Sequence, residues 1–197
     1  MKTHMQSSAA VSLLAGLVLL VGCEPAAKGL SPEVVESQRQ RFKLAEEPAD
    51  PVTPLDLRES GGAEELNGRP VVLVGQIGGV ANPYDTEPDF PFKAGEATLF
   101  LVDPSTAAEM ADHMSDPNHA EECAFCKARA KDKLASVATV TFVDEQGKTL
   151  PVGAQELLAV KAGDVVVIEG EAKILPSPGG ATADQLVVTA TGLYVRE

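Results

Sequence analysis

The sequence of 197 residues contains no tryptophan, and aromatic side chains make up only 4% of it. Few residues are therefore available to stack against bases or sugar rings. Basic residues are also fewer than acidic ones. The chain has 16 Lys and Arg and 29 Asp and Glu, which gives a formal net charge of -13. Since nucleic-acid binding depends largely on Lys and Arg that neutralise phosphates, this composition predicts no nucleic-acid partner.

The sequence also lacks the short motifs of common enzyme classes. It has no Gly-rich phosphate-binding loop, no Gly-x-Ser-x-Gly nucleophile elbow and no His-Glu-x2-His zinc signature. Each of these motifs places reactive groups in a fixed local geometry, so their absence removes the usual sequence evidence for catalysis. We therefore predict that the protein is not an enzyme.

Cysteine is scarce, and the first of the three, Cys23, follows a segment with the features of a secretory signal peptide. A short start with one firm positive charge precedes an apolar run from Ala9 to Val21, and Gly22 comes before the cysteine. The run is shorter than the roughly 20 residues that a membrane-spanning helix needs, which disfavours an uncleaved anchor.

The residues Leu20-Val-Gly-Cys23 resemble the lipobox of bacterial lipoproteins, in which the chain is cut before the cysteine and lipid is attached to it. The resemblance implies that residues 1–22 are removed as a signal peptide and that Cys23 is acylated, for example with palmitate. The mature protein would then be held by its lipid in the cell envelope. It would lie outside the cytoplasm, on the periplasmic side of the outer or inner membrane.

The mature chain divides into a tether over residues 23–67 and a globular domain over residues 68–197. Prolines punctuate the tether, and Ser31-Pro32-Glu33 predicts the start of a short helix that ends near Leu44. Val34, Val35 and Phe42 of this helix are available to rest on the domain. We expect the rest of the tether to be a semi-extended spacer.

Five apolar runs with strand character and one short helical segment make up the domain. Glycines within the first and fourth runs, Gly75 and Gly170, suggest strands that bend or coil sharply. The predicted strands cover residues 71–77, 97–102, 137–143, 165–174 and 186–195, and the predicted helix covers residues 153–161.

This order of elements is similar to that of the OB-fold, a five-stranded, partly open Greek-key barrel. Val71–Ile77 resembles its long, bent first strand, the segment 153–161 lies where its helix belongs, and Lys161–Gly170 resembles its fourth strand. The resemblance implies a mainly β fold, an OB-like barrel with a short helix. A helical insert, residues 105–134, lies between strands two and three.

The insert contains most of the reactive side chains of the mature chain. His113, His119, Cys123 and Cys126 offer two imidazoles and two thiols, and Cys-x2-Cys is the commonest half of a tetrahedral zinc site. Met110 and Met114 add thioethers at helical spacing, which would suit copper better than zinc, although methionines at that spacing are more often packing residues. The insert therefore predicts a site for zinc or copper formed by these histidines and cysteines.

Two other interpretations of Cys123 and Cys126 remain open. In an oxidising compartment the pair can form a disulfide that pins the insert, since residues i and i+3 of a helical turn are close enough for that bond. The same spacing occurs in thiol-redox proteins. Covalent haem attachment is excluded because Lys127, and not histidine, follows the second cysteine.

The sequence as a whole predicts a membrane-anchored, extracytoplasmic binding or interaction module. Its Cys/His insert would bind a structural metal or form a disulfide, and its partner would be an unidentified protein or small ligand. The first alternative is a thiol-redox or copper-delivery protein of the envelope that uses Cys123 and Cys126 directly. The second is a purely structural envelope lipoprotein.

Overall fold

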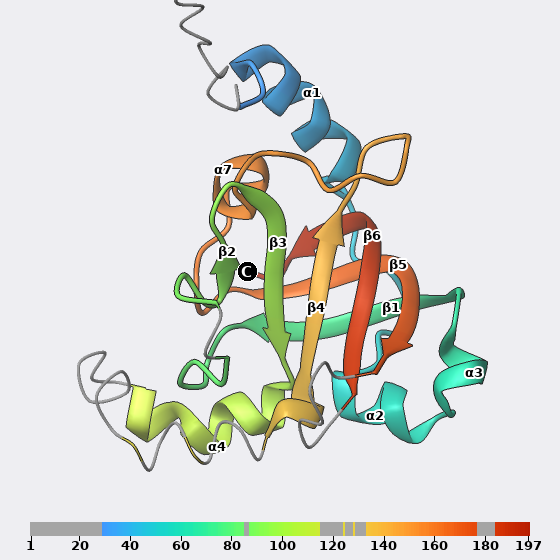
Figure 1. Ribbon diagram of the computed structural model, residues 1–197, viewed down its shortest axis with the longest axis vertical. Helices are drawn as coiled ribbons and strands as arrows, with labels where there is room; N and C mark the ends of the chain where they lie inside the picture. Colours follow the sequence, from blue (N-terminus) through green and yellow to red (C-terminus); the bar gives the residue numbers. More distant parts are fainter. Residues whose placement is uncertain (1–28, 85–86, 115–123, 125–127, 129–132, 177–183) are drawn as a thin grey trace, which may run out of the picture.

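The computed structural model describes residues 29–84, 87–114, 124, 128, 133–176 and 184–197. Three of the described helices come first, and the strands follow them with helical segments before and after the fourth strand (Figure 1). In chain order the described elements are α1 (Pro32–Phe42), α2 (Pro54–Glu59), α3 (Ala63–Leu66), β1 (Arg69–Ile77), β2 (Phe92–Lys93), β3 (Glu96–Val102), α4 (Pro104–Met114), η1 (Leu134–Ser136), β4 (Val137–Phe142), α7 (Ala154–Leu158), β5 (Val165–Leu175) and β6 (Gln185–Val195).

The six strands form one mixed sheet in the order β1-β5-β6-β4-β3-β2. The end of β1 also pairs with β3, so that five strands follow one another in a ring. Neighbours are antiparallel except β4 and β6, which run parallel with Ala138 opposite Leu186. The prediction of a mainly β fold with five strands and a short helix is confirmed, and β2 is an additional strand of two residues.

The main core lies inside this ring. Alternate residues of each strand point inward, as expected for strands with one buried face. Leu73, Leu99, Val140, Ile168 and Val188 of β1, β3, β4, β5 and β6 are all fully buried there. The helix α7 closes one end of the ring with Leu157 and Leu158.

Gly75 and Gly170 lie where strands approach too closely for a side chain. A Cβ on Gly75 would lie 3.0 Å from the carbonyl oxygen of Val102 in β3, and one on Gly170 would lie 2.4 Å from that of Thr189 in β6. The pairing of β5 with β6 also shifts between Glu169 and Gly170. The predicted irregularity is therefore confirmed at Gly170, whereas Gly75 marks the close crossing of β1 over β3.

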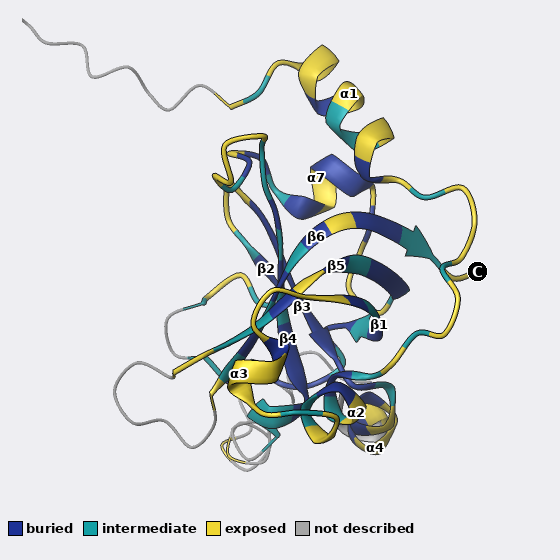
Figure 2. Cartoon of the chain, turned by 90° about the vertical axis from the view of Figure 1, so that its right-hand side faces the viewer, coloured by how far each residue is buried: buried dark blue, intermediate teal, exposed yellow. Residues whose placement is uncertain are grey.

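The helix predicted from Pro32 is confirmed, and it packs on the domain. Ser31 caps α1 by accepting a hydrogen bond from the backbone of Val34, and Val35 and Phe42 are 5% and 1% exposed in the main core. Val34, which we expected to share this contact, is 42% exposed. Figure 2 shows most of α1 as exposed, with only short buried stretches along it.

The spacer predicted after this helix is wrong, because that segment folds onto the sheet. Val52 pairs with β1: its N–H donates to the carbonyl of Val72 and its carbonyl accepts from the N–H of Val74, both at 2.9 Å. Leu57 of α2 and Leu66 of α3 are at most 1% exposed within the main core. These two leucines close parts of the core that the strands alone leave open.

Candidate functional site

Most of the predicted site residues lie outside the described part of the chain. This applies to Cys23, His119, Cys123 and Cys126, and for His113 the structure describes only its backbone, in the last turn of α4. The metal, disulfide and acylation hypotheses therefore stay predictions. Among the residues that the structure describes, no group of three or more His, Cys, Asp or Glu is arranged to hold a metal ion.

The structure does describe the stem from which the Cys/His insert leaves the domain. The N–H of Asp103, at the end of β3, donates to the carbonyl of Ser136, just before β4, at 2.8 Å. One helical turn further out, the ammonium group of Lys133 lies 2.6 Å from a carboxylate oxygen of Glu109. The two ends of the insert are thus fixed side by side where β3 ends and β4 begins.

Asp103 joins the insert to the N-terminal segment. The residue is 2% exposed, and its Oδ1 accepts hydrogen bonds from the N–H of Ser105 at 2.9 Å and from its hydroxyl at 2.6 Å. Its Oδ2 accepts from the N–H of Leu55 at 3.4 Å. Burial opposes ionisation, but hydrogen bonds from Ser105, Thr53 and Leu55 outweigh it and hold the pKa of the carboxyl below its ordinary value. One carboxylate thus connects the starts of α2 and α4.

We expect Asp103→Asn to lower the free energy of unfolding by about 1–3 kcal/mol at pH 7, because an amide cannot accept all of these hydrogen bonds. Since the folded pKa is depressed, the stabilisation is complete above the unfolded value of about 3.9 and is lost as the pH falls through the lower folded pKa. Urea unfolding at pH 7 and pH 3 measures this, with the exposed Glu59→Gln as a control. A deficit of equal size at both pH values would contradict the prediction.

A second apolar cluster holds α4 against the outer face of β3. Met110 is fully buried in this cluster, so it serves in packing, which is the more common role of methionines at helical spacing. The rings of Tyr84 and Phe90, from the segment between β1 and β2, lie 5.0 and 5.4 Å from the ring of Phe100 in β3. The described cluster comprises Val80, Ala81, Phe100, Val102, Ala107, Met110 and Val137, with Tyr84 and Phe90 packed against it.

Beside this cluster, Arg58 of α2 reaches toward the start of β6. Its Nη2 donates to the carbonyl of Asp184 at 2.9 Å, and its Nε is buried with no hydrogen-bond partner among the described residues. Burial lowers the pKa of Arg58, while Tyr84 and Asp184 oppose that change. Burial raises the pKa of Tyr84 to about 12, so this phenol is neutral at pH 7. Nothing in the sequence distinguishes Arg58 or Tyr84 from other surface residues.

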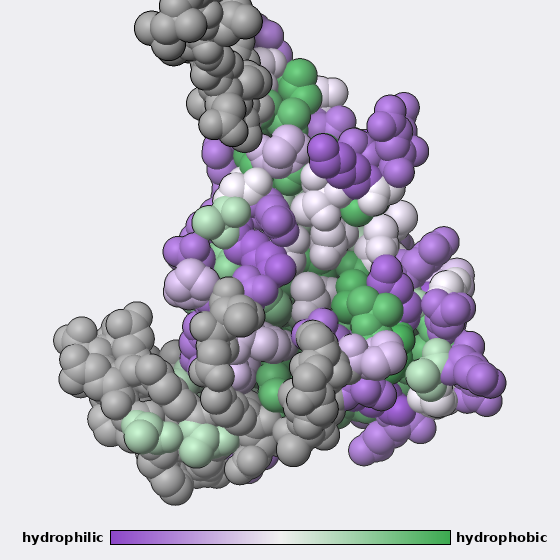
Figure 3. All heavy atoms as spheres, in the orientation of Figure 1, coloured by the Kyte–Doolittle hydropathy of each residue, from purple (hydrophilic) through white to green (hydrophobic). Residues whose placement is uncertain are grey.

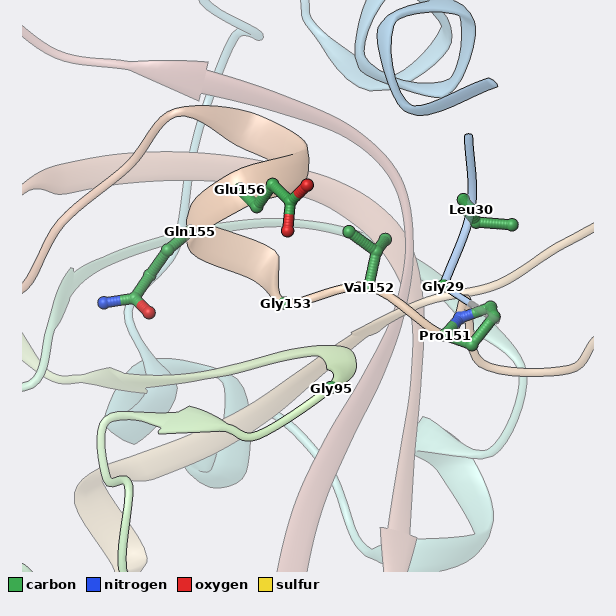
Figure 4. Close-up of a pocket in the computed structure, with 8 residues that line it drawn as sticks. All are labelled: Gly29, Leu30, Gly95, Pro151, Val152, Gly153, Gln155 and Glu156. Carbon is green, nitrogen blue, oxygen red and sulfur yellow. The ribbon is translucent and has the colours of Figure 1, made fainter. Parts of the chain in front are cut away.

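A cavity of about 510 Å³ lies at the opposite end of the sheet, beside α7. Figure 4 shows Gln155 and Glu156 projecting from α7, with Gly95 in the turn below them and Leu30 on the other side. The lining residues are Gly29, Leu30, Gly95, Pro151, Val152, Gly153, Gln155 and Glu156. Among these described lining residues, Gln155 contributes an amide and Glu156 a carboxylate, which can form hydrogen bonds to a ligand.

Arg39 fixes the helix α1 beside this cavity. Its Nε donates to the carbonyl of Leu157 at 2.9 Å, and its Nη2 donates to the carbonyl of Glu156 at 2.7 Å. These carbonyls belong to the last turn of α7, where the helix leaves them without intrahelical partners. The guanidinium therefore caps α7 and holds α1 against it.

The face of the sheet shown in Figure 3 is bordered by hydrophilic side chains, which gather over α3 and over the turn after β4. Both of these regions carry exposed acidic residues, Glu64 and Glu65 in α3 and Glu145 in the turn. Apolar residues appear in patches between them. These exposed carboxylates contribute to the net negative charge of the chain.

Comparison with known proteins assigns no family to this chain. No family model matches it, and no curated protein matches it. A solved structure described as aspartyl tRNA synthetase from Entamoeba histolytica is similar at 13% identity and a TM-score of 0.35, over 79% of this chain and 24% of that one. The chain therefore spans about a quarter of the length of that protein, and a likeness of this size carries no argument about fold or function. In the part of the chain that is described, no helix is long and apolar enough to cross a membrane.

Proposed function

We propose that this protein is a lipid-anchored binding or interaction module of the cell envelope, without enzymatic activity, built on an OB-like fold. The ring order β1-β5-β6-β4-β3, the parallel pairing of β4 with β6 and the helix α7 between β4 and β5 support the OB-like part of the proposal. The lipobox-like residues Leu20–Cys23 support the anchor. Modules of this fold carry many functions, so the function has to be argued from the site.

The observation that carries the proposal is the fixed stem of the insert. Both ends of the insert are held on the sheet, by the backbone hydrogen bond from Asp103 to Ser136 and by the ion pair of Lys133 with Glu109. The stem therefore fixes the two ends of the segment 115–132, here called the appendage, whose sequence includes three of the four predicted ligands. In this proposal a metal or a disulfide at Cys123 and Cys126 stabilises the appendage, which contacts the partner.

An assay of metal and thiols on the mature, acylated protein tests this proposal. With Cys23 acylated, only Cys123 and Cys126 can react with a thiol reagent. We expect one of two results: about one zinc per chain with thiols that react only after chelation, or no metal and no reactive thiol. Either result identifies a structural role for the pair.

The variant His119→Ala distinguishes the two structural forms. It should reduce zinc binding if a metal holds the appendage, and it should change neither metal nor thiol content if a disulfide does. Two thiols that are free without chelation, that cycle rapidly with a physiological reductant, or that bind copper would instead favour redox or metal-delivery activity and overturn the proposal.

A further inference from the structure

The chain is fixed to the domain from Leu30 onward. Leu30 packs against the main core, Arg39 hydrogen-bonds to the last turn of α7, and Phe42 is buried. If Cys23 is acylated, as the proposed function requires, the lipid attachment lies only seven positions before Leu30, the first residue that packs on the domain. Fully extended, seven residues span at most about 25 Å, and a flexible chain of that length averages roughly 15 Å.

The place where the chain joins the domain is at one end of the molecule. Figures 1 and 2 both show α1 and α7 at one end, and α2, α3 and α4 at the other. Gly29 and Leu30 line the cavity at the α7 end, whereas the stem of the insert belongs to the far end. A domain of this size has a radius of gyration of about 15 Å, so its far end extends well beyond the reach of the seven residues.

The charges of the two ends also favour an orientation in which the end with α1 faces the membrane. The helix α1 carries two acidic residues, Glu33 and Glu36, and two basic ones, Arg39 and Arg41. The segment Pro54–Leu66 at the far end carries four acidic residues and one basic residue. A surface of anionic lipid headgroups repels the acidic segment more strongly, because such surfaces attract Lys and Arg and repel Asp and Glu.

We propose that the end formed by α1, α7 and the cavity between α7 and Leu30 faces the lipid surface, and that the stem of the Cys/His insert faces away from it. This inference rests on the proposed function, since it requires the acylated Cys23. In this orientation, the surface that lies next to the cavity is that of the anchoring bilayer. It also identifies the partner of the insert as a water-soluble molecule rather than a lipid of that bilayer.

Fluorescence energy transfer in vesicles tests the orientation. A fluorescent amino acid is placed at Gln155, which is exposed on α7, or at Glu64, which is exposed on α3, in the acylated full-length protein. The vesicles contain phosphatidylethanolamine and phosphatidylglycerol with an acceptor dye on the headgroups. We expect at least twofold greater transfer from position 155 than from position 64, because the short tether keeps α7 within about 25 Å of the surface.

A matched variant with about 20 added Gly and Ser residues before Gly29 should reduce the transfer from position 155 at least twofold, since the reach of a flexible linker grows with its length. Equal transfer from both positions, or greater transfer from position 64, would overturn the orientation. Mass spectrometry of the purified protein distinguishes a wrong orientation from a failure of the proposed function. Absence of an acyl chain on Cys23 refutes the anchor itself and the orientation with it.

Discussion

Replacing Phe42 with alanine should lower the free energy of unfolding by about 3–5 kcal/mol, the range for truncating a buried phenylalanine. Phe42 is 1% exposed, and its ring packs edge-on against Phe142 of β4 with the centroids 5.1 Å apart. The substitution removes this ring pair and leaves a cavity between α1 and the sheet. An isolated helix of 11 residues is marginal in water, so α1 depends on this contact to remain folded.

Urea unfolding of the wild-type protein and of Phe42→Ala measures the difference, and Val34→Ala is the matched control on the same helix. Val34 is 42% exposed, so its truncation should cost less than about 1 kcal/mol. Equal effects of the two substitutions would show that α1 does not depend on its contact with the domain. A large effect confined to Phe42 would show that the N-terminal segment is part of the folded domain.

The strands were predictable because each one combines apolar residues at alternate positions with clear turn residues at its ends. Val137–Phe142 illustrates this, since Ala138, Val140 and Phe142 point into the core and Thr139 and Thr141 do not. The short helix α7 was predictable from Gly153 before it and from its apolar residues, but it ends at Leu158, before the predicted end at residue 161, and Ala159 after it takes the left-handed conformation. In these segments, the face that the local sequence pattern marks as apolar is the face that the tertiary structure buries.

The N-terminal segment was not predictable in the same way, because its apolar residues are few and separated by charged residues and prolines. Leu57 and Leu66 lie in helices of six and four residues, too short to show a helical period. Their burial depends on openings in the core that only the assembled sheet creates. From composition alone, this segment was therefore predicted to be a spacer, although it completes the core.

The candidate site was predictable only in part. Asp103 followed by Pro104 is a recognisable helix start, yet the hydrogen bond to Leu55 joins residues 48 positions apart and has no local signature. The same holds for Lys133 with Glu109, which lie 24 positions apart. Spacing of Cys and His predicts chemistry within the insert, but the way the insert is fixed to the sheet depends on long-range contacts.

Replacing Gly170 with alanine should lower the free energy of unfolding by about 3 kcal/mol or more. A Cβ at this position would lie 2.4 Å from the carbonyl oxygen of Thr189 and 2.8 Å from Cγ1 of Val188. The first neighbour is backbone of a paired strand, so it can move only if β5 and β6 separate at the point where their pairing shifts. Overpacking of a well-ordered core typically costs 1–3 kcal/mol, and a clash with fixed backbone lies at or above the upper end of that range.

The matched control is Gly62→Ala, at a glycine with nothing within 4 Å of its Cβ position and a φ of −76°. This change should alter stability by less than about 1 kcal/mol, since Gly62 is exposed and precedes a short helix. Urea unfolding compares both variants with the wild type. If Gly170→Ala stayed within 1 kcal/mol of the wild type, β5 and β6 would not approach as closely as described. A large loss limited to Gly170 would instead support a ring of strands whose close pairing requires a glycine at this shift in register.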